Sequence, residues 1–316
     1  MKMDYSHIGL ARLCAWFGVT RQAYYQHLWS ASDYVVEQEL IIQEVLEIRK
    51  NHRFMGVRKL YEKLQPFMLE HQIKMGRDAL FDLLSYHGLL IRRSKRRVVT
   101  THSFHWLRKY PNLIREFVPT APNQLWVSDI TYWKINNKDV YINLITDAYS
   151  RYIVGYHGAP TLEAIESIKA LKMALNTIKN TSNRALIHHS DRGVQYCSSD
   201  YVKLLQDNQI AISMTENGDP LENAIAERIN GIIKNEYLID YSLDTIESAQ
   251  QLLNKAVELY NYDRPHMSIG NLTPAHVHYS RTTIKTERLW KNYYRKNNSF
   301  VNEYKDLDIH VNSLQD

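Results

Sequence analysis

Three apolar segments follow one another closely in the middle of the chain and constrain its fold more than any other feature. Residues 125–132, 140–146 and 152–156 are rich in β-branched and aromatic side chains. Short polar turns at 136–137 and 147–151 separate them, and connections of this kind join antiparallel neighbours. The pattern therefore predicts a meander of three antiparallel strands.

A different alternation follows the meander. The segment at about 162–177 has helical spacing, and the apolar residues 185–190 come after it. A helix that leads into a strand is typical of a crossover connection. Gly193 permits a sharp turn, which places Asp191 at the carboxyl end of that strand, where open α/β sheets bind their ligands. The sequence thus predicts an α/β core with Asp191 at its ligand-binding edge and Asp129 on the first strand of the meander.

Glu227 lies in a segment with clear helical periodicity. Its apolar residues fall on one helical face, formed by Ile225, Ile229, Ile232 and Ile233. The other face is polar and carries Asn223, Glu227, Asn230 and Lys234. Residues 216–220 before the helix are polar and contain glycine and proline, which predicts a loop. A carboxylate behind such a loop can swing toward the two aspartates.

Three acidic residues in these positions suggest a metal site. Sixty-one residues separate Asp129 from Asp191, and 35 separate Asp191 from Glu227. Three converging carboxylates can bind a pair of divalent cations, which activate water or a 3′-hydroxyl to attack a phosphodiester. The chain has 34 acidic residues, however, so spacing alone is weak evidence. Without a longer motif, ordinary turn aspartates and a solvated helix glutamate are the commoner explanation.

Longer motifs surround all three residues. They read W-x-x-D-I-T-Y around Asp129, H-S-D-R-G-x-Q-Y around Asp191 and N-A-x-A-E-x-x-x-x-x-x-K-N-E around Glu227. Downstream, the chain continues with Tyr260-Asn261, Arg264-Pro265-His266 and Leu272-Thr273-Pro274. In this order the motifs resemble the DDE transposases of the insertion sequence 3 family, specifically the second-reading-frame type, which are related to retroviral integrases. The resemblance covers nearly the whole chain.

The resemblance implies a fold and a set of metal ligands. We expect an α/β fold, with an RNase H-like catalytic core of the retroviral-integrase type preceded by all-α helix-turn-helix modules. By similarity, Asp129, Asp191 and Glu227 would be catalytic and would bind two Mg²⁺ ions, which Mn²⁺ can replace. Lys234 matches a family position associated with contacts to the element-end DNA. The family often has G-N-x-x-D-N before the glutamate helix, whereas residues 217–223 read N-G-D-P-L-E-N, which puts this loop's DNA contacts in doubt.

The family's activity is metal-dependent cleavage and strand transfer of DNA at insertion-sequence ends. Its members typically join one end to the other first, as a figure-eight and then a circle. Their active enzyme is usually a fusion with a first-reading-frame product. By resemblance we expect double-stranded DNA as substrate, a homo-oligomer on DNA, and the first-reading-frame protein as a partner. Two alternatives remain: a catalytically silent DNA-binding regulator, and an RNase H-like nuclease that cuts without joining.

Several residues near the motifs have open roles. His189 shares a strand face with Asp191, so it is a candidate to orient a metal ligand or the DNA from a second layer, although a structural histidine is the commoner outcome. Asp147 and Arg151 are expected to organise the turn between the second and third strands. The Arg264-Pro265-His266 stretch either packs against a helix end or contacts DNA, and its sequence does not decide between these roles.

The first 32 residues have the pattern of a helix-turn-helix. Gly18 supplies a turn and Thr20 an N-cap for a helix predicted at residues 21–28. Arg21 and Gln22 would then lie exposed near its start, where a recognition helix meets base edges. A helical hairpin without a role in DNA binding explains the same periodicity, and the family resemblance favours DNA or dimer contact.

A second helical module of the helix-turn-helix type is predicted at residues 33–97. Gly56 and Gly76 come at the starts of two of its helices, and Gly88 closes the last one. The module ends in a basic run that we expect to contact phosphates, formed by Arg92, Arg93, Lys95, Arg96 and Arg97.

The rest of the chain divides into a linker at residues 98–122, the integrase-like core at 123–280 and a tail at 281–316. Charge is unevenly spread, because residues 1–120 hold 19 lysines and arginines against 11 acidic residues, while the whole chain has a formal net charge of only +5. A basic front attached to an acidic core suits a polyanionic substrate.

Cysteine usage and hydropathy argue against other classes of protein. Cys14 and Cys197 are far apart, so we expect neither a disulfide framework nor the zinc module of retroviral integrases. The amino terminus lacks a signal-peptide pattern, and no apolar stretch reaches the roughly 18 residues that suggest a membrane helix. We therefore expect a cytoplasmic, nucleoid-associated protein without membrane contact.

Overall fold

The computed structural model describes residues 7–91, 106–135, 138–178, 185–216, 222–239, 241 and 245–280. Two compact units emerge from its contacts. One contains residues 1–51 and 55–91, and the other contains residues 52–54 and 92–316. Each unit has its own core and is described by itself.

The first unit is helical. It contains α1 (Leu10–Trp16), α2 (Arg21–Asn51), α3 (Val57–Glu70) and α4 (Arg77–Tyr86). Gly56 and Gly76 are the N-cap residues of α3 and α4, and Gly88 follows α4 with a positive φ of 66°. The predicted helix starts and end are thereby confirmed. Buried side chains of α2, α3 and α4 form one core that includes Ile41, Val45, Leu60, Leu64, Leu80 and Leu84.

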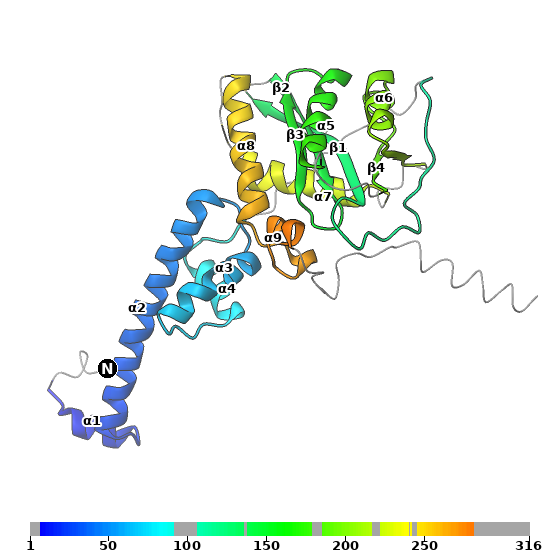
Figure 1. The fold of residues 1–316 in the computed structure, drawn as a ribbon. Coiled ribbons are helices and arrows are strands. Elements are labelled where there is room, and N and C mark those ends of the chain that lie inside the picture. Colours follow the sequence, from blue (N-terminus) through cyan, green and yellow to red (C-terminus); the bar gives the residue numbers. More distant parts are fainter. Residues whose placement is uncertain are drawn as a thin grey trace, which may run out of the picture. The chain divides into compact units, whose positions relative to one another are not determined.

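Helix α2 differs from its predicted length. The helix expected at residues 21–28 begins at Arg21, where Thr20 Oγ1 accepts a hydrogen bond from the Ala23 N–H at 3.0 Å, but it continues to Asn51 (Figure 1). No glycine or proline occurs between residues 21 and 51, so nothing in the backbone chemistry stops the helix. The boundary predicted between residues 32 and 33 falls inside this continuous helix.

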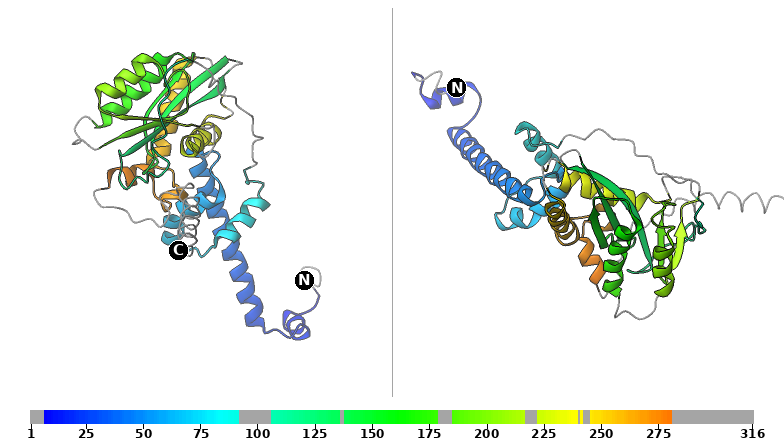
Figure 2. Two further views of the ribbon diagram at one scale, coloured as in Figure 1. Left: turned by 90° about the vertical axis from the view of Figure 1, so that its right-hand side faces the viewer. Right: turned by 90° about the horizontal axis from the view of Figure 1, so that it is seen from above.

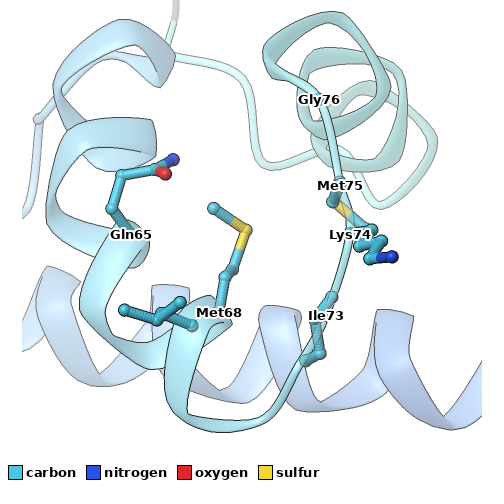
Figure 3. Close-up of a pocket in the computed structure, with 7 residues that line it drawn as sticks. Gln65, Met68, Ile73, Lys74, Met75 and Gly76 are labelled. Carbon is cyan, nitrogen blue, oxygen red and sulfur yellow. The ribbon is translucent and has the colours of Figure 1, made fainter.

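An open groove of about 420 Å³ lies in the helical unit beside α3 and the chain that leads into α4 (Figure 3). Its lining is mostly apolar and consists of Gln65, Met68, Leu69, Ile73, Lys74, Met75 and Gly76. None of the three carboxylates singled out by the sequence belongs to it.

The second unit is built on a five-stranded mixed sheet. Its strands are β1 (Leu125–Ile135), β2 (Lys138–Asp147), β3 (Ile153–Ala159), β4 (Ile187–Ser190) and β5 (Ala211–Met214). Their order in the sheet is β3-β2-β1-β4-β5. β1, β2 and β3 pair antiparallel as the predicted meander, whereas β4 pairs parallel with both β1 and β5. This is the RNase H-like arrangement that the motifs predict.

Helices cover both faces of this sheet (Figure 2). On one face, α5 (Ala164–Ile178) and α6 (Ser199–Asp207) share a core with β-strand residues such as Trp126 and Ile145. On the other face, α7 (Ala224–Ile232), the π-helix η1 (Ile233–Leu238) and α8 (Ile246–Tyr262) pack around Ile142 and Leu144. Neighbouring residues of β2 thus point into different cores, as the alternation of a strand requires.

Close packing dictates the residue at one position of β3. A Cβ atom on Gly155 would lie 2.2 Å from the carbonyl oxygen of Ala170 in α5. Any other residue would therefore push α5 away from the sheet, since no real Cβ contact is that short. Glycine lets α5 approach the strand backbone closely.

The turn between β2 and β3 is organised as predicted. Asp147 Oδ1 accepts hydrogen bonds from the backbone N–H and the hydroxyl of Ser150, both at 2.7 Å. Its Oδ2 accepts the Asn123 N–H at 2.7 Å, which ties the turn to the residues before β1. Arg151 adopts a positive φ of 66° at the end of the turn. Asp147 is fully buried, so these bonds satisfy a carboxylate that water does not reach.

The chain after α8 packs into the core instead of facing DNA. This decides the open role of the Arg264-Pro265-His266 stretch, because Arg264 is only 1% exposed and His266 is also buried. The Arg264 guanidinium donates to both oxygens of Glu236 in η1, from Nε at 2.8 Å and from Nη2 at 2.9 Å. The bidentate pair joins the end of α8 to the π-helix that follows α7. It thereby anchors the segment that directly follows α7, the helix that carries Glu227.

We predict that Arg264→Ala lowers the free energy of unfolding by about 3–5 kcal/mol, because it leaves the mostly buried Glu236 carboxylate without its partner. Urea unfolding followed by circular dichroism measures this loss. Arg77→Ala, which removes a pair with Asp78 whose side chains are largely exposed, is the matched control and should cost well under about 1 kcal/mol. Equal losses in the two variants would contradict the role given to Arg264.

Candidate active site

Asp129 lies on β1 with both carboxylate oxygens held by donors of the protein. Oδ1 accepts the backbone N–H of Ile130 at 2.9 Å. Oδ2 accepts the side-chain amide of Asn230 at 2.8 Å. Asn230 belongs to α7, so this second bond crosses from the helix to the sheet. The carboxylate of Asp129 therefore has a fixed position relative to α7.

Asp191 lies beside Asp129 because β4 runs parallel to β1 and ends next to the middle of β1. The register of β1 and β4 pairs Ser128 with Ser190, and each aspartate is the next residue of its strand or just beyond it. The backbone N–H of Gly193 donates to Asp191 Oδ1 at 3.0 Å, which holds the turn after β4. The predicted placement of Asp191 at the carboxyl end of a strand is confirmed.

Glu227 lies in the first turn of α7, as predicted, and its side chain is exposed. Two asparagines bracket it on the same helix. Asn223, the N-cap residue, donates from Nδ2 to the carbonyl of Ser128 at 2.9 Å, and Asn230 donates to Asp129. The amides fasten the helix to two successive residues of β1, with Glu227 between them.

The structure corrects the expected surroundings of these asparagines. The helical pattern placed Asn223 and Asn230 on a polar face together with Glu227, yet both asparagines are buried. Their face of α7 turns toward polar groups within β1, where the Ser128 carbonyl and the Asp129 carboxylate need donors. Sequence reasoning missed their role because it treated a polar helix face as a solvent face. Their spacing of four residues before and three residues after Glu227 was the available signal.

Lys234 follows α7 in the π-helix η1. Its ammonium nitrogen lies 4.0 Å from the ring centroid of Tyr132, which is on β1 three residues after Asp129. The cation is therefore close to the strand that carries the first aspartate.

The three carboxylates act on one another electrostatically. The pKa of Asp129 is raised to about 7, mainly by burial, next by the charge of Asp191 and least by the charge of Glu227, against the lowering effect of the hydrogen bonds from Asn230 and Ile130. Burial and then the charge of Asp191 also raise the pKa of Glu227. Negative charge is therefore concentrated here, which is the electrostatic condition that a divalent ion relieves.

The donor chemistry fits a hard divalent cation such as Mg²⁺, which prefers carboxylate oxygens. Within the described part of the chain, no three His, Cys, Asp or Glu side chains are already gathered tightly enough to hold a metal ion. Capture of a metal therefore requires the carboxylates to draw closer. Glu227 is the exposed member of the three, whereas donors from the protein already hold Asp129 and Asp191.

His189 has an identified partner away from the carboxylates. It is fully buried, and its Nδ1 lies 2.8 Å from Ser213 Oγ on β5. Burial lowers its pKa to about 4, and burial lowers the pKa of the adjacent His188 to about 3, so both rings are neutral near pH 7. His188 contacts Ser128 Oγ at 2.7 Å on the neighbouring strand. The expected influence of His189 on a metal ligand or on DNA stays a prediction.

The remaining predicted DNA contacts fall into two groups. Arg21 and Gln22 are exposed at the start of α2 in the helical unit. The basic run lies outside the described residues and comprises Arg92, Arg93, Lys95, Arg96 and Arg97. The structure thus brings together only Asp129, Asp191, Glu227 and Lys234 from the predicted site.

Among the helices that the structure describes, none is long and apolar enough to cross a membrane.

Comparison with known proteins agrees with this geometry. Residues 119–220 and 208–274 each match a family model described as an integrase core domain. The chain is 34% identical to the insertion element IS600 uncharacterized 31 kDa protein of Shigella sonnei, over 83% of this chain and 96% of that protein. It is 31% identical to the transposase for insertion sequence element IS629 of Shigella sonnei, over 74% of this chain and 76% of that protein. It is also 31% identical to the transposase InsF for insertion sequence IS3A of Escherichia coli, over 60% of this chain and 66% of that protein.

We predict that Asp129→Asn stabilises the metal-free protein at about pH 8 by on the order of a few kcal/mol. A carboxyl group whose pKa is raised by folding loses stability as pH rises from its ordinary value of 3.8 through about 7, because the folded state must then accept a buried charge. The gain should vanish near pH 4, where Asp129 is protonated in the folded protein. Chemical unfolding at the two pH values measures the difference.

The control for this variant is Asp139→Asn, which removes an exposed carboxylate of β2 and should leave the unfolding free energy almost unchanged at either pH. If Asp129→Asn instead loses the same stability at both pH values, ionisation of the Asp129 carboxylate does not destabilise the folded protein.

Proposed function

The chain belongs to the insertion sequence 3 family of DDE transposases, and we propose that Asp129, Asp191 and Glu227 are its catalytic carboxylates. The observation that carries this proposal is their placement. Asp129 lies within β1 just past its last pair with β4, Asp191 follows the end of β4, and Glu227 lies on a helix that Asn223 and Asn230 fasten to β1. Three separate motifs thereby supply acidic groups to one region of the sheet, where the charge of Asp191 helps to raise the pKa of both Asp129 and Glu227.

We propose that these carboxylates bind two Mg²⁺ ions and that Mn²⁺ can replace them. When bound, such ions polarise the phosphodiester and favour the ionised form of the attacking oxygen. The residues of the chain prepare the site for this task. Asn230 holds Asp129 in one orientation, the Gly193 N–H holds Asp191, and exposed Glu227 is placed to close on the ligand.

The reaction that we propose has two transfers at phosphorus. Water first attacks a phosphodiester at the element end and releases a 3′-hydroxyl, and that hydroxyl then attacks a second phosphodiester and expels another 3′-oxygen. Each step breaks one phosphorus–oxygen bond and forms one, so no nucleotide cofactor is consumed. In keeping with the family, we propose that the two element ends are joined first, as a figure-eight and then a circle.

We propose that DNA is held by cations in both units. Lys234 lies near the catalytic strand through its contact with Tyr132, so it is placed to reach a phosphate of the element end. Arg21 and Gln22 are exposed at the start of a helix that Thr20 caps, the position from which a recognition helix reads bases. The basic run of five cations at residues 92–97 would add phosphate contacts, whose strength depends on salt.

The assembly that we propose is a homo-oligomer on double-stranded DNA, associated with the nucleoid and joined by the first-reading-frame protein of the same element. Family membership supports this proposal. Exposed apolar side chains at the tip of the helical unit, Trp16, Phe17 and Val19, are available for such contacts.

We predict that Glu227→Gln abolishes both nicking and joining of labelled DNA that carries the element ends, while binding to that DNA persists. The amide keeps the size of the side chain but removes the charge that holds a cation. Glu247→Gln, which alters an exposed glutamate in the first turn of α8, is the matched control and should retain both steps. Gel analysis in Mg²⁺ or Mn²⁺ measures the products.

The outcomes of this experiment separate the candidate functions. Cutting without joining by the wild-type chain would identify a nuclease instead of a transposase. Binding of DNA without any metal-dependent product, in the presence of the first-reading-frame protein, would identify a silent regulator. Activity that survives in Glu227→Gln would remove Glu227 from the catalytic set.

We further predict that the affinity for Mn²⁺ rises as the pH is raised from about 6 to about 8, because Asp129 must lose its proton before it can bind the ion and its pKa is about 7. Calorimetric titrations in buffers of different ionisation enthalpy should detect proton release on binding near pH 6. An affinity that does not change over this range would mean that Asp129 is not a ligand.

A further inference from the structure

Residues 111–117, which precede β1, run beside the edge strand β5. We call this segment the strap. The backbone N–H of Met214 donates to the carbonyl of Pro111 at 3.3 Å, and the Leu113 N–H donates to Ser213 Oγ at 2.9 Å. The strap therefore covers the outer edge of the sheet, which would otherwise present unpaired backbone groups. Through Ser213 it also reaches the buried ring of His189.

The strap next engages two glutamates near the start of α7. The backbone N–H of Asn112 donates to Glu216 Oε1 at 2.9 Å, and the Arg115 guanidinium pairs with Glu216 Oε2 at 2.6 Å. The side-chain amide of Asn112 donates to Glu222 Oε1 at 3.2 Å. Glu222 in turn accepts the Glu216 N–H at 2.7 Å. One asparagine thus links the strap to both glutamates.

Glu222 occupies a sensitive place in the chain. It directly precedes Asn223, the N-cap residue of α7, and only 4% of it is exposed. A carboxylate so deeply buried depends on its donors, because water cannot replace them. The donors from Asn112 and from the Glu216 backbone therefore fix the point at which α7 begins.

An apolar contact adds a second attachment. Ile114 of the strap is buried in the same cluster as Ala226, and the half-buried Phe117 and Ile225 pack against that cluster. Ala226 is the residue before Glu227, so the strap supports the helix next to the proposed catalytic glutamate. A helix as short as α7 has little stability of its own and takes its position from contacts of this kind.

We propose that the strap is a positioning element for Glu227. It holds the amino-terminal end of α7 through Asn112 and Ile114, while Asn223 and Asn230 hold the same helix against β1. Glu227 is the exposed carboxylate that must close on the metal, so the orientation of its helix decides how well it reaches. The proposal rests on the proposed catalytic role of Glu227 and assigns the segment predicted as a linker an additional role in the site.

Hydrogen exchange and metal binding test this proposal in the full-length chain. Asn112→Ala should speed amide exchange in residues 224–232 roughly tenfold, because one hydrogen bond to a buried carboxylate is lost, and should leave the amides of β2 and β3 unchanged. The Mn²⁺ concentration that half-saturates the protein, measured by electron paramagnetic resonance, should rise by a similar factor. Binding of DNA in the absence of metal should stay the same.

Two further variants make the test decisive. Asn208→Ala removes an exposed asparagine whose amide donates only to the local Leu204 carbonyl at 2.8 Å, and it should change neither readout. Arg115→Gln breaks the ion pair with Glu216 at a side chain that is 45% exposed, so it creates no buried cavity. It therefore tests the strap if Asn112→Ala does not fold. Its effects should have the same direction and be smaller.

Uniformly faster exchange throughout the second unit, or unchanged exchange in α7, would overturn the proposal, because the strap would then contribute only general stability or nothing. Faster exchange in α7 with unaltered Mn²⁺ binding would also overturn it, since the helix would move without affecting the site. A third outcome separates the two proposals. If Asn112→Ala loses protection in α7 and binds Mn²⁺ more weakly, but the wild-type chain neither cuts nor joins DNA, the proposed function is refuted and the positioning role stands.

Discussion

The hydrogen bond from the Asn230 amide to the Asp129 carboxylate is the contact on which the rest of the site depends. It joins a helix to a strand whose sequences lie about a hundred residues apart. Parallel pairing of β1 with β4 brings Asp191 to the same edge, and the second amide, from Asn223, prevents α7 from pivoting about the first. With α7 fixed at two points seven residues apart, about two helical turns, Glu227 lies between them at a defined place relative to the two aspartates. The geometry of the proposed site is thus a consequence of how α7 is attached to the sheet.

This attachment must withstand the repulsion that it creates. Burial and mutual charge raise the pKa of Asp129 to about 7, so the metal-free fold bears a penalty for holding its carboxylates together. Contacts at the two ends of α7 oppose that penalty. The Arg264–Glu236 pair secures the following π-helix to the end of α8, and the strap secures the helix start. A divalent cation would attract all three carboxylates and offset their mutual repulsion. Binding of the ion would therefore restore the stability that the metal-free site loses.

Local patterns predicted much of this architecture, and they failed where distant partners decide. The meander, the helix that leads into β4 and the turn at Asp147 follow from periodicity and turn chemistry, both of which are local. The burial of Asn230 did not follow. A helical wheel separates polar from apolar residues, but it does not show whether the polar face contacts solvent or the polar groups of a strand. The strap was predicted as a linker for the same reason. The roles of Asn112 and Arg115 depend on contacts with Glu222 and Glu216, which are distant in sequence. Helix α2 runs past its expected end because the sequence between residues 21 and 51 contains no glycine or proline to stop it.

The most direct test of the central claim is to locate the metal itself. Crystals grown with Mn²⁺ and the element-end DNA would reveal the ions by anomalous scattering. The account predicts anomalous peaks between the carboxylates of Asp129 and Asp191, with Glu227 turned inward to complete the ligand set and α7 still attached to β1 through Asn223. Ions bound elsewhere, or a site in which Glu227 stays turned toward solvent while the DNA is cut, would contradict it.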